Sequence, residues 1–456
     1  MLEQQGSHPQ GAHQPAHQPA WQRRRDVLGL LAAGLGSSAL QESWALGLAP
    51  GFDASAAPEL RPLAGLPGQD LSADGLVVDG KIPAGLRGVY YRNGPGLMAR
   101  GAERYRHWFD GDGFVQALRF EAGGVSHRGR FVQTAKFKAE ARERRFLVPA
   151  LGTAIAPRMP LRGPDSMNVA NTSVLRQAGR LYALWEGGSA YELDPASLAT
   201  LGPRAWSEEL DGLPFSAHPK QEADGTSWNF GSFETASGSR MVIYQLDAGG
   251  ALRKSEVFEI PATAMVHDFA VSQRYLVFLL APIRLDMAAW RAGGISMLDA
   301  MHWQGDAPTK VLVIDKADLG RRRILEMPAC FVFHFGNAWD ADGQIHLDYV
   351  QGAALPEVNA GLEALMRGRR PPARVSTPRF MRIDLAAGRI GVQSRDEAVE
   401  FPVVDPRVVA RRYAKVFYPS AVDLGERWGF NALMGLDLDS GRRERFVFDA
   451  DTVVEE

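Results

Sequence analysis

The stretch FVFHFG at residues 331–336 places His334 inside a short apolar run that predicts a β-strand. The stretches SAHPK at 216–220 and MVHDF at 265–269 place His218 and His267 in similar surroundings. The three histidines are 49 and 67 residues apart, which is too far for one helix or one hairpin. This spacing fits one histidine from each of three successive β-sheet units that meet at a common axis.

Neutral imidazoles that converge in this way are typical of a transition-metal site. A single strand histidine is more often a core or surface residue, so the prediction depends on three similar settings. A catalytic zinc with an open position and a non-haem iron that handles dioxygen both fit a histidine-only site. The pattern alone does not choose between them.

The composition is that of an ordinary globular protein, with 45% hydrophobic and 23% charged residues among 456. The net charge of −2 gives no support for nucleic-acid binding. The one cysteine, Cys330, excludes an intrachain disulfide framework and a cysteine zinc cluster. The composition therefore leaves the histidines as the main candidates for chemistry.

The N-terminal region predicts a tail and an export signal. Residues 1–20 are rich in Gln, His, Pro and Ala and are expected to be disordered. In the segment 21–56, Arg23–Leu28 precedes a short apolar run and resembles a twin-arginine signal. A periplasmic or exported location follows if this signal is used, and a cytoplasmic one otherwise. The alternative is a stray basic segment before a helix.

From about Gly65 the sequence predicts many short strands separated by turns. Asp-Gly pairs recur along the chain and favour hairpins. Many strands without a βαβ rhythm favour an all-β propeller, and the absence of a clear repeat leaves the number of blades open. The strand candidates are 88–92, 114–120, 181–185, 241–245, 275–280, 310–315, 345–350, 379–384 and 445–448.

Two segments interrupt the β pattern, and we expect them to form helical or loop insertions. They are 284–301, RLDMAAWRAGGISMLDAM, and 353–370, which contains VNAGLEALMRGRR. The first carries apolar residues at roughly helical spacing. It fits a cap packed on the propeller, or an apolar mouth that contacts a membrane peripherally and takes up lipid-like substrate.

Two glutamates stand in apolar strand contexts, Glu186 in LWEGG and Glu400 in VEFP. A buried carboxylate is costly unless it is paired, and orienting a metal-binding histidine would supply a partner. The alternative is that both glutamates face solvent at strand edges.

At these residues the chain resembles the carotenoid cleavage oxygenase family, which includes apocarotenoid and lignostilbene dioxygenases. The resemblance runs from about Gly85 to Glu456, and its motifs together are highly specific. They are GVYYRNGPG (88–96), HWFDGDGFV (107–115), RFVQTAKF (130–137), NVANTSV (168–174), ALWEGGSAYELD (183–194), SAHPK (216–220), HDFAVSQRYLVF (267–278), FHFGNAW (333–339), EFPVVDPR (400–407) and FNALMGLDLDSG (430–441).

The resemblance implies a seven-bladed propeller with a helical cap and one ferrous ion on the axis. The family holds this ion with four histidines, of which three match His218, His267 and His334. It also implies that Glu186 contacts His267 and that Glu400 contacts His334. Two further matches are Glu456, a third such glutamate, and Thr134, beside an open iron position.

The chain departs from the family pattern at its C-terminal end. The fourth family histidine is expected after Glu456, where this sequence stops. We therefore expect residues 57–456 to form a single propeller domain whose last blade is incomplete, with unpaired edges and an exposed flank.

The activity implied by the resemblance is oxidative cleavage of a conjugated C=C bond by dioxygen to two carbonyl products. Lignostilbene members bind a phenol through a tyrosine and a lysine. That lysine is expected where Phe146 and Leu147 stand, which favours a carotenoid or apocarotenoid substrate. A lignostilbene-type enzyme, a polyene-binding remnant without full activity and a zinc hydrolase remain as alternatives.

Overall fold

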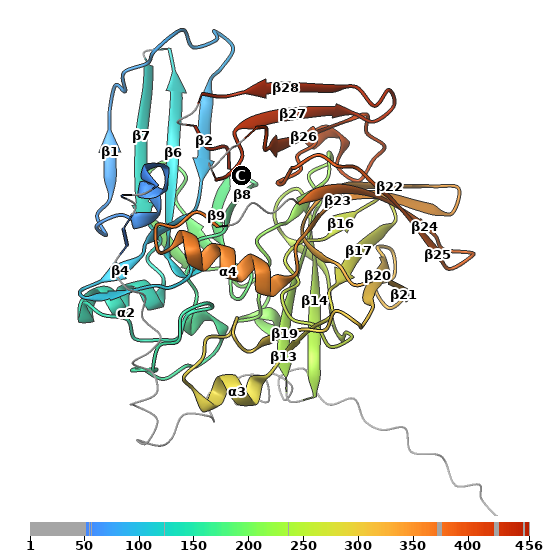
Figure 1. Ribbon diagram of the computed structural model, residues 1–456, viewed down its shortest axis with the longest axis horizontal. Helices are drawn as coiled ribbons and strands as arrows, with labels where there is room; N and C mark the ends of the chain where they lie inside the picture. The colour runs from blue at the N-terminus through green and yellow to red at the C-terminus, as the bar shows by residue number, and fades with distance from the viewer. Residues whose placement is uncertain are drawn as a thin grey trace, which may run out of the picture.

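The computed structural model describes residues 52–455, except 54, 56, 123, 236, 372–375, 424–427 and 450–451. The expected tail at 1–20, the basic stretch Arg23–Leu28 and Glu456 lie outside the described residues. Among the helices that are described, none is long and apolar enough to span a membrane. The chain is mostly β and is arranged as a propeller (Figure 1).

Six sheets of three to five antiparallel strands follow one another along the chain. The first two contain β1 (Leu71–Ala73), β2 (Gly88–Arg92), β3 (Pro95–Leu97), β6 (Asp112–Glu121) and β7 (Gly124–Phe131), then β8 (Ser173–Gln177), β9 (Arg180–Leu184), β10 (Tyr191–Leu193) and β11 (Thr200–Pro203). The third and fourth contain β12 (Lys220–Gln221), β13 (Ser227–Thr235), β14 (Gly238–Leu246) and β15 (Leu252–Glu259), then β16 (Ala270–Val271), β17 (Tyr275–Leu280), β20 (Thr309–Asp315) and β21 (Arg322–Met327). The last two contain β22 (Phe331–Ala341), β23 (Gln344–Gly352), β24 (Thr377–Asp384) and β25 (Arg389–Ser394), then β26 (Lys415–Ser420), β27 (Ala432–Asp437) and β28 (Arg443–Val447).

Two ribbons and three helices complete the described fold. The ribbons pair β4 (Ala99–Arg100) with β5 (Glu103–Arg104) and β18 (Ile283–Leu285) with β19 (Met301–Trp303). The helices are α2 (Ala135–Glu143), α3 (Met287–Ala292) and α4 (Leu355–Leu365). Figure 1 shows α4 across the middle of the view and α3 at the lower side.

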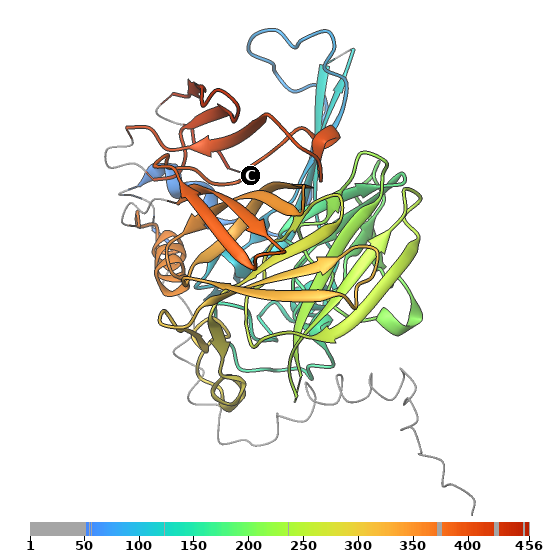
Figure 2. The same ribbon diagram turned by 90° about the vertical axis from the view of Figure 1, so that its right-hand side faces the viewer.

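The core lies between successive sheets, which explains the continuous apolar runs of the inner strands. Side chains of β13 and β14 meet those of β17 and β20 in one buried cluster. Side chains of β17 and β20 that point the other way meet β22, β23 and β24 in a second cluster. Strands buried on both faces have no polar side, so the run YLVFLL of β17 is apolar throughout. The red strands of the sixth sheet pack in the same way against the fifth (Figure 2).

The number of sheets differs from the expected seven. Six sheets of three or more strands occur in the described part of the chain, and the sixth has three strands. The number seven came from the family resemblance alone, because the sequence shows no repeat from which to count blades. The strands themselves were predicted well, since each of the nine candidate segments overlaps a strand of the structure.

The Asp-Gly pairs predicted a hairpin turn correctly at some positions and wrongly at others. Asp342 and Gly343 both have positive φ, 51° and 76°, and join β22 to β23 in a tight hairpin. Asp112 and Gly113 instead lie inside β6, where Asp112 is buried. There the aspartate is part of a buried ion-pair cluster, and its tertiary contacts override the local turn preference.

The segment 284–301 packs against the propeller, with some of its apolar residues buried and others partly buried, and its contact with a membrane stays a prediction. It contains α3 between the strands of a ribbon, and Trp290 and Leu298 are buried. Trp290 packs with Leu147 and Leu161, which lie more than a hundred residues earlier. The second expected insertion contains α4. Helical spacing therefore indicated burial against the propeller in the first segment.

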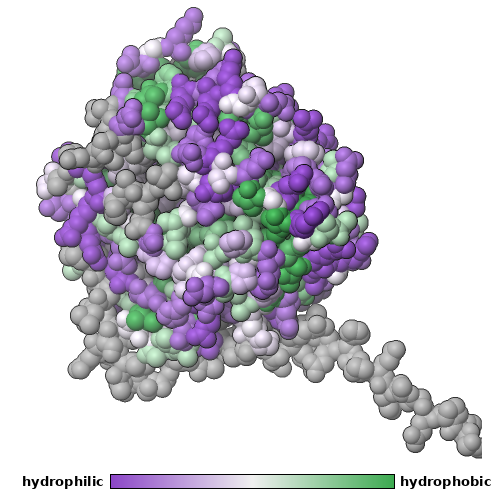
Figure 3. Space-filling view, turned by 45° about the vertical axis from the view of Figure 1, so that its right-hand side comes forward, coloured by the Kyte–Doolittle hydropathy of each residue, from purple (hydrophilic) through white to green (hydrophobic). Residues whose placement is uncertain are grey.

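The outer face of the sixth sheet carries exposed apolar side chains. Phe417, Leu433 and Phe446 are 49%, 43% and 64% exposed, and the pairing register sets Leu433 opposite Phe446. On the face shown in Figure 3, apolar side chains gather in patches between polar ones.

Candidate metal centre

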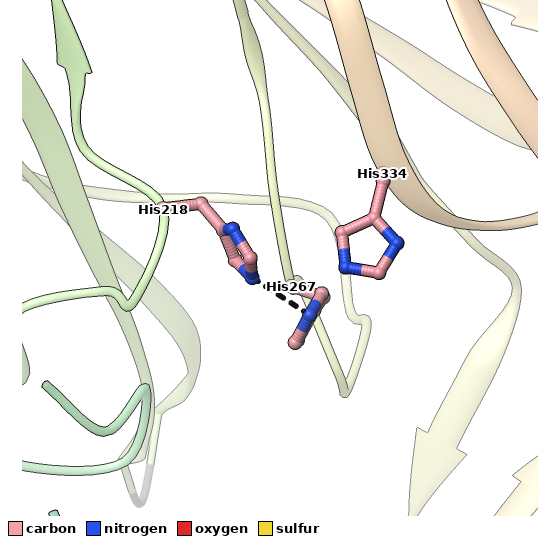
Figure 4. A group of neighbouring side chains, drawn as sticks. All are labelled: His218, His267 and His334. Atoms are coloured by element: carbon pink, nitrogen blue, oxygen red, sulfur yellow. Dashed lines mark hydrogen bonds between the residues drawn. The ribbon is translucent and has the colours of Figure 1, made fainter. Parts of the chain in front are cut away.

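The three histidines come from the first strands of three successive sheets. His334 lies within β22, His218 lies two residues before β12, and His267 lies three residues before β16. β12, β16 and β22 each form one edge of their sheet. The side chains point toward a common centre, as Figure 4 shows, and one ring nitrogen from each lies within 4.8 Å of the others. These edges therefore line the axis on which the sheets converge.

The ring nitrogens are close and carry no counter-charge between them. Nε2 of His218 lies 2.9 Å from Nε2 of His267. Burial, and then the neighbouring His267 and His334, lower the pKa of His218 well below its ordinary value. His218 is therefore neutral at physiological pH, with a lone pair available for a cation.

Two carboxylates accept hydrogen bonds from Nδ1 of two of the imidazoles and so orient these rings. Glu186, just after β9, places Oε2 2.5 Å from Nδ1 of His267, and Glu400 places Oε2 2.8 Å from Nδ1 of His334. A carboxylate that accepts from Nδ1–H leaves Nε2 unprotonated and directed away from the carboxylate. These are the two pairings that the resemblance implied. They contradict the alternative that both glutamates face solvent.

The backbone beside Glu400 is strained in a way that holds the carboxylate. Phe401 has φ of 51°, a left-handed conformation that costs a bulky residue about 1–3 kcal/mol. Its N–H donates to the same Oε2 of Glu400 that contacts His334. Met265, two residues before His267, also has positive φ at 63°. Such strain is typical of sites whose geometry is fixed by their surroundings.

Two phenylalanine rings contact His267 and His334. Phe333 lies 5.1 Å from the His267 ring between centroids, edge to face, and Phe401 lies 5.0 Å from the His334 ring. Phe109 in turn packs against Phe333. The sequence did not single out these rings. The centre therefore combines metal-binding nitrogens with an apolar surrounding.

Thr134, Lys136 and the pair Phe146–Leu147 can now be placed. Thr134 is buried and caps α2, where its hydroxyl accepts from the N–H of Phe137, so its place beside a metal stays a prediction. Lys136 is buried in ion pairs with Asp112 and Glu140. Phe146 and Leu147 are buried apolar residues, as their sequence suggests.

The donor set fits a divalent transition metal. Imidazole nitrogen is a preferred ligand for iron, zinc and copper, and convergence of three neutral imidazoles is otherwise unfavourable packing of polar groups. Within the described residues, this is the group of histidine, cysteine and carboxylate side chains that could hold an ion. The arrangement does not by itself distinguish iron from zinc.

Comparison with known proteins identifies the family. The family model of the retinal pigment epithelial membrane protein matches residues 68–456. The chain is 31% identical to apocarotenoid-15,15'-oxygenase of Synechocystis over 80% of its length and 76% of the relative. It is 30% identical to lignostilbene-alpha,beta-dioxygenase isozyme III of Sphingomonas paucimobilis, over 60% of this chain and 56% of that protein.

A solved structure of a relative agrees with the fold. The structure of cobalt-substituted Synechocystis apocarotenoid oxygenase superimposes with a TM-score of 0.76 at 27% identity. The match covers 88% of this chain and 85% of that one. The residues matched by the family model include the three sheets that supply the histidines. This chain therefore belongs to the family of the retinal pigment epithelial membrane protein and the carotenoid cleavage oxygenases.

Proposed function

We propose that this protein is a non-haem Fe(II)-dependent oxygenase that cleaves a C=C bond of a carotenoid or apocarotenoid to carbonyl products. The observation that supports it most is the convergence of three histidine nitrogens within 4.8 Å, two of whose rings are oriented by Glu186 and Glu400. The oxygenase relatives and the family assignment point to the same chemistry.

The proposed ligands of the ferrous ion are His218, His267 and His334. When bound, the ion supplies activation of dioxygen for alkene cleavage. Glu186 and Glu400 keep the Nδ1 protons of their histidines in place, so that the Nε2 lone pairs remain available. Because imidazole binds a metal in its neutral form, these ligands would leave the positive charge of the ion uncompensated.

The apolar surrounding supports a conjugated hydrocarbon as substrate. Phe333 and Phe401 are partly exposed and touch the histidine rings, so an alkene near the centre would meet aromatic faces. Their role is to position the alkene and exclude water, which requires no acid or base from the protein.

A stilbene substrate is the second candidate, because one relative is a lignostilbene dioxygenase. Binding of its phenol in that way would need a lysine near positions 146 and 147, and both positions hold buried apolar residues. Lys136 does not substitute for it, since Nζ is engaged by Asp112, Glu140 and the hydroxyl of Tyr105. These contacts favour the polyene.

The test combines metal content with product analysis. Purified protein reconstituted with Fe(II) is expected to hold about one iron per chain and to convert an apocarotenoid to aldehydes with uptake of dioxygen. His267→Ala is expected to lose both iron and product. His127→Ala is the matched control, because His127 contacts Gln116 away from the cluster. Iron binding that is equal in wild type and His267→Ala would contradict the proposal. Turnover with zinc and without dioxygen would favour the hydrolase.

A further inference from the structure

Asp268, the residue after His267, makes bonds to the segments that carry the other two histidines. The residue is 4% exposed. Its Oδ2 accepts from the N–H of Phe335, which follows His334, at 2.8 Å. The ammonium group of Lys220, two residues after His218, lies 2.8 Å from Oδ1 and 3.0 Å from Oδ2.

This carboxylate therefore joins three sheets at one point. Lys220 belongs to β12 of the third sheet, Asp268 precedes β16 of the fourth, and Phe335 belongs to β22 of the fifth. Oδ1 also accepts from the N–H of Phe269 at 2.7 Å, which fixes the rotamer of the aspartate itself. Each attachment lies one or two residues from a histidine of the centre.

Ser216 adds a second, weaker connection between two of the same segments. It is buried, and its hydroxyl accepts from the N–H of His218 at 3.3 Å and donates to the carbonyl of His267 at 3.4 Å. Backbone on both sides of the centre is thus tied across the sheet boundary.

One hydrogen bond, between Nε2 of His218 and Nε2 of His267, joins two of the rings directly in the described contacts, so the spacing of all three rings depends on the segments that carry them. Contacts between sheets are mainly apolar and adapt to small shifts, whereas a charge-assisted hydrogen bond has a narrow range of length and direction. Metal coordination tolerates only small errors, of about 0.5 Å, in ligand position. A charged connection next to each histidine is therefore placed where it controls ligand spacing most.

We propose that Asp268, with Lys220, is a positioning residue that sets the spacing of the three histidines for metal binding. The inference rests on the proposed metal centre and extends it to two residues that contact no histidine ring in the described contacts. It distinguishes Asp268 from a carboxylate that only stabilises the propeller.

A matched ion pair elsewhere between two of the same sheets provides the control. Glu222 accepts from Lys316 at 2.7 Å and from the indole N–H of Trp228 at 2.8 Å, and Lys316 also donates to the carbonyl of Ser272. The pair also connects the third and fourth sheets. Its partners are four or more residues from every histidine of the centre.

The experiment titrates Co²⁺ into metal-free full-length protein and records affinity and the visible absorption spectrum, which depends on ligand geometry. Asp268→Asn is expected to bind Co²⁺ about tenfold or more weakly and with a changed spectrum, as found when groups that orient metal ligands are removed. Glu222→Gln is expected to keep the wild-type affinity and spectrum. The Co²⁺ affinity and spectrum of Lys220→Arg are expected to be closer to those of wild type than the affinity and spectrum of Lys220→Met are.

The outcomes separate this inference from the proposed function. Wild-type protein that binds neither Co²⁺ nor Fe²⁺ overturns the metal centre and this inference with it. If wild-type protein binds Co²⁺ and Asp268→Asn has the same affinity and spectrum, the inference alone is overturned. It is also overturned if Glu222→Gln loses as much Co²⁺ affinity as Asp268→Asn does. If Asp268→Asn does not fold, the two lysine variants decide, and identical spectra for them would count against positioning.

Discussion

Two of the polar clusters in the described part of the chain are built on opposite principles. In the first, the ammonium group of Lys136 contacts Asp112, Glu140 and the hydroxyl of Tyr105, and Arg100 pairs with the same two carboxylates. In the second, three histidines bring their ring nitrogens together around a point. The first cluster has two cations and two anions, whereas the second consists of side chains of one kind that can each offer a ring nitrogen to a metal ion.

The difference shows how a structural cluster can be told from a ligand site. Burial works to lower the pKa of Lys136, but Asp112 and Glu140 outweigh it, and the pKa ends above its ordinary value. The pKa of His218 falls instead, because burial and then the neighbouring His267 and His334 oppose its charge. A cluster that satisfies its own charges needs nothing more, while the histidine cluster would be completed by the metal ion that we propose.

The largest effect on stability is expected for Lys136→Met, which removes one of the two cations from the ion-pair cluster of Asp112 and Glu140. It leaves two buried carboxylates with Arg100 alone, and should lower the free energy of unfolding by about 3–5 kcal/mol. Urea unfolding of metal-free protein measures this change in the free energy of unfolding. Adding Glu140→Gln to Lys136→Met should recover part of the loss. A decrease below about 1 kcal/mol would show that Arg100 alone neutralises the cluster.

Loss of a ligand from the histidine cluster should mainly affect metal binding. His267→Ala is expected to weaken binding by about 3 kcal/mol, a quarter of the roughly 10–16 kcal/mol typical of four-ligand zinc sites. Competition with a chelator measures the affinity. The metal-free protein should lose less stability than Lys136→Met does. If metal-free stability falls as much in both, the contrast between the clusters is wrong.

A smaller effect on metal affinity is expected when the carboxylates that contact Nδ1 of His267 and His334 are changed. Glu186→Gln and Glu400→Gln should each weaken metal binding about tenfold to hundredfold, since the amide orients Nδ1–H less strongly. The surface pair of Glu192 with Arg180 provides the control, and Glu192→Gln should leave metal affinity unchanged. Equal affinities in all three variants would mean that the glutamates only pack beside the rings.

The smallest effect concerns Asp348, a buried carboxylate with no cation. Its bonds come from the hydroxyls of Tyr413 and Tyr418 and from the N–H of Asn337. Burial raises its pKa from 3.8 to about 6, so the fold favours the protonated form. This stabilisation is complete below the unfolded pKa and is lost as pH rises through about 6.

The pH dependence of Asp348→Asn tests that assignment. Between pH 7 and pH 5, wild-type metal-free protein should gain about 1 kcal/mol more stability than the variant does. The difference between the two proteins isolates this carboxyl from all the titratable groups that they share. Parallel stability curves would show that the tyrosines keep Asp348 ionised.

The sequence predicted the strands and the histidine cluster, because both depend on local patterns. The run YLVFLL marks β17 by its own composition, and His267 and His334 carry recognisable neighbours. The number of sheets and the inward packing of Trp290 depend on partners far along the chain. Asp268 and Lys220 had a visible signal, a carboxylate and an ammonium beside two candidate ligands, but only the fold showed that they meet.

The placement of one ligand at the first strand of each sheet also has a consequence for folding. Strands within a sheet pair with neighbours along the chain and can form early, whereas the three histidines meet only when three sheets have docked. The unfolded chain would have to close loops of 49 and 67 residues to hold the same ion. If the proposed metal ion binds, its capture during refolding should report the docking of the three sheets and should lag behind the appearance of β-structure.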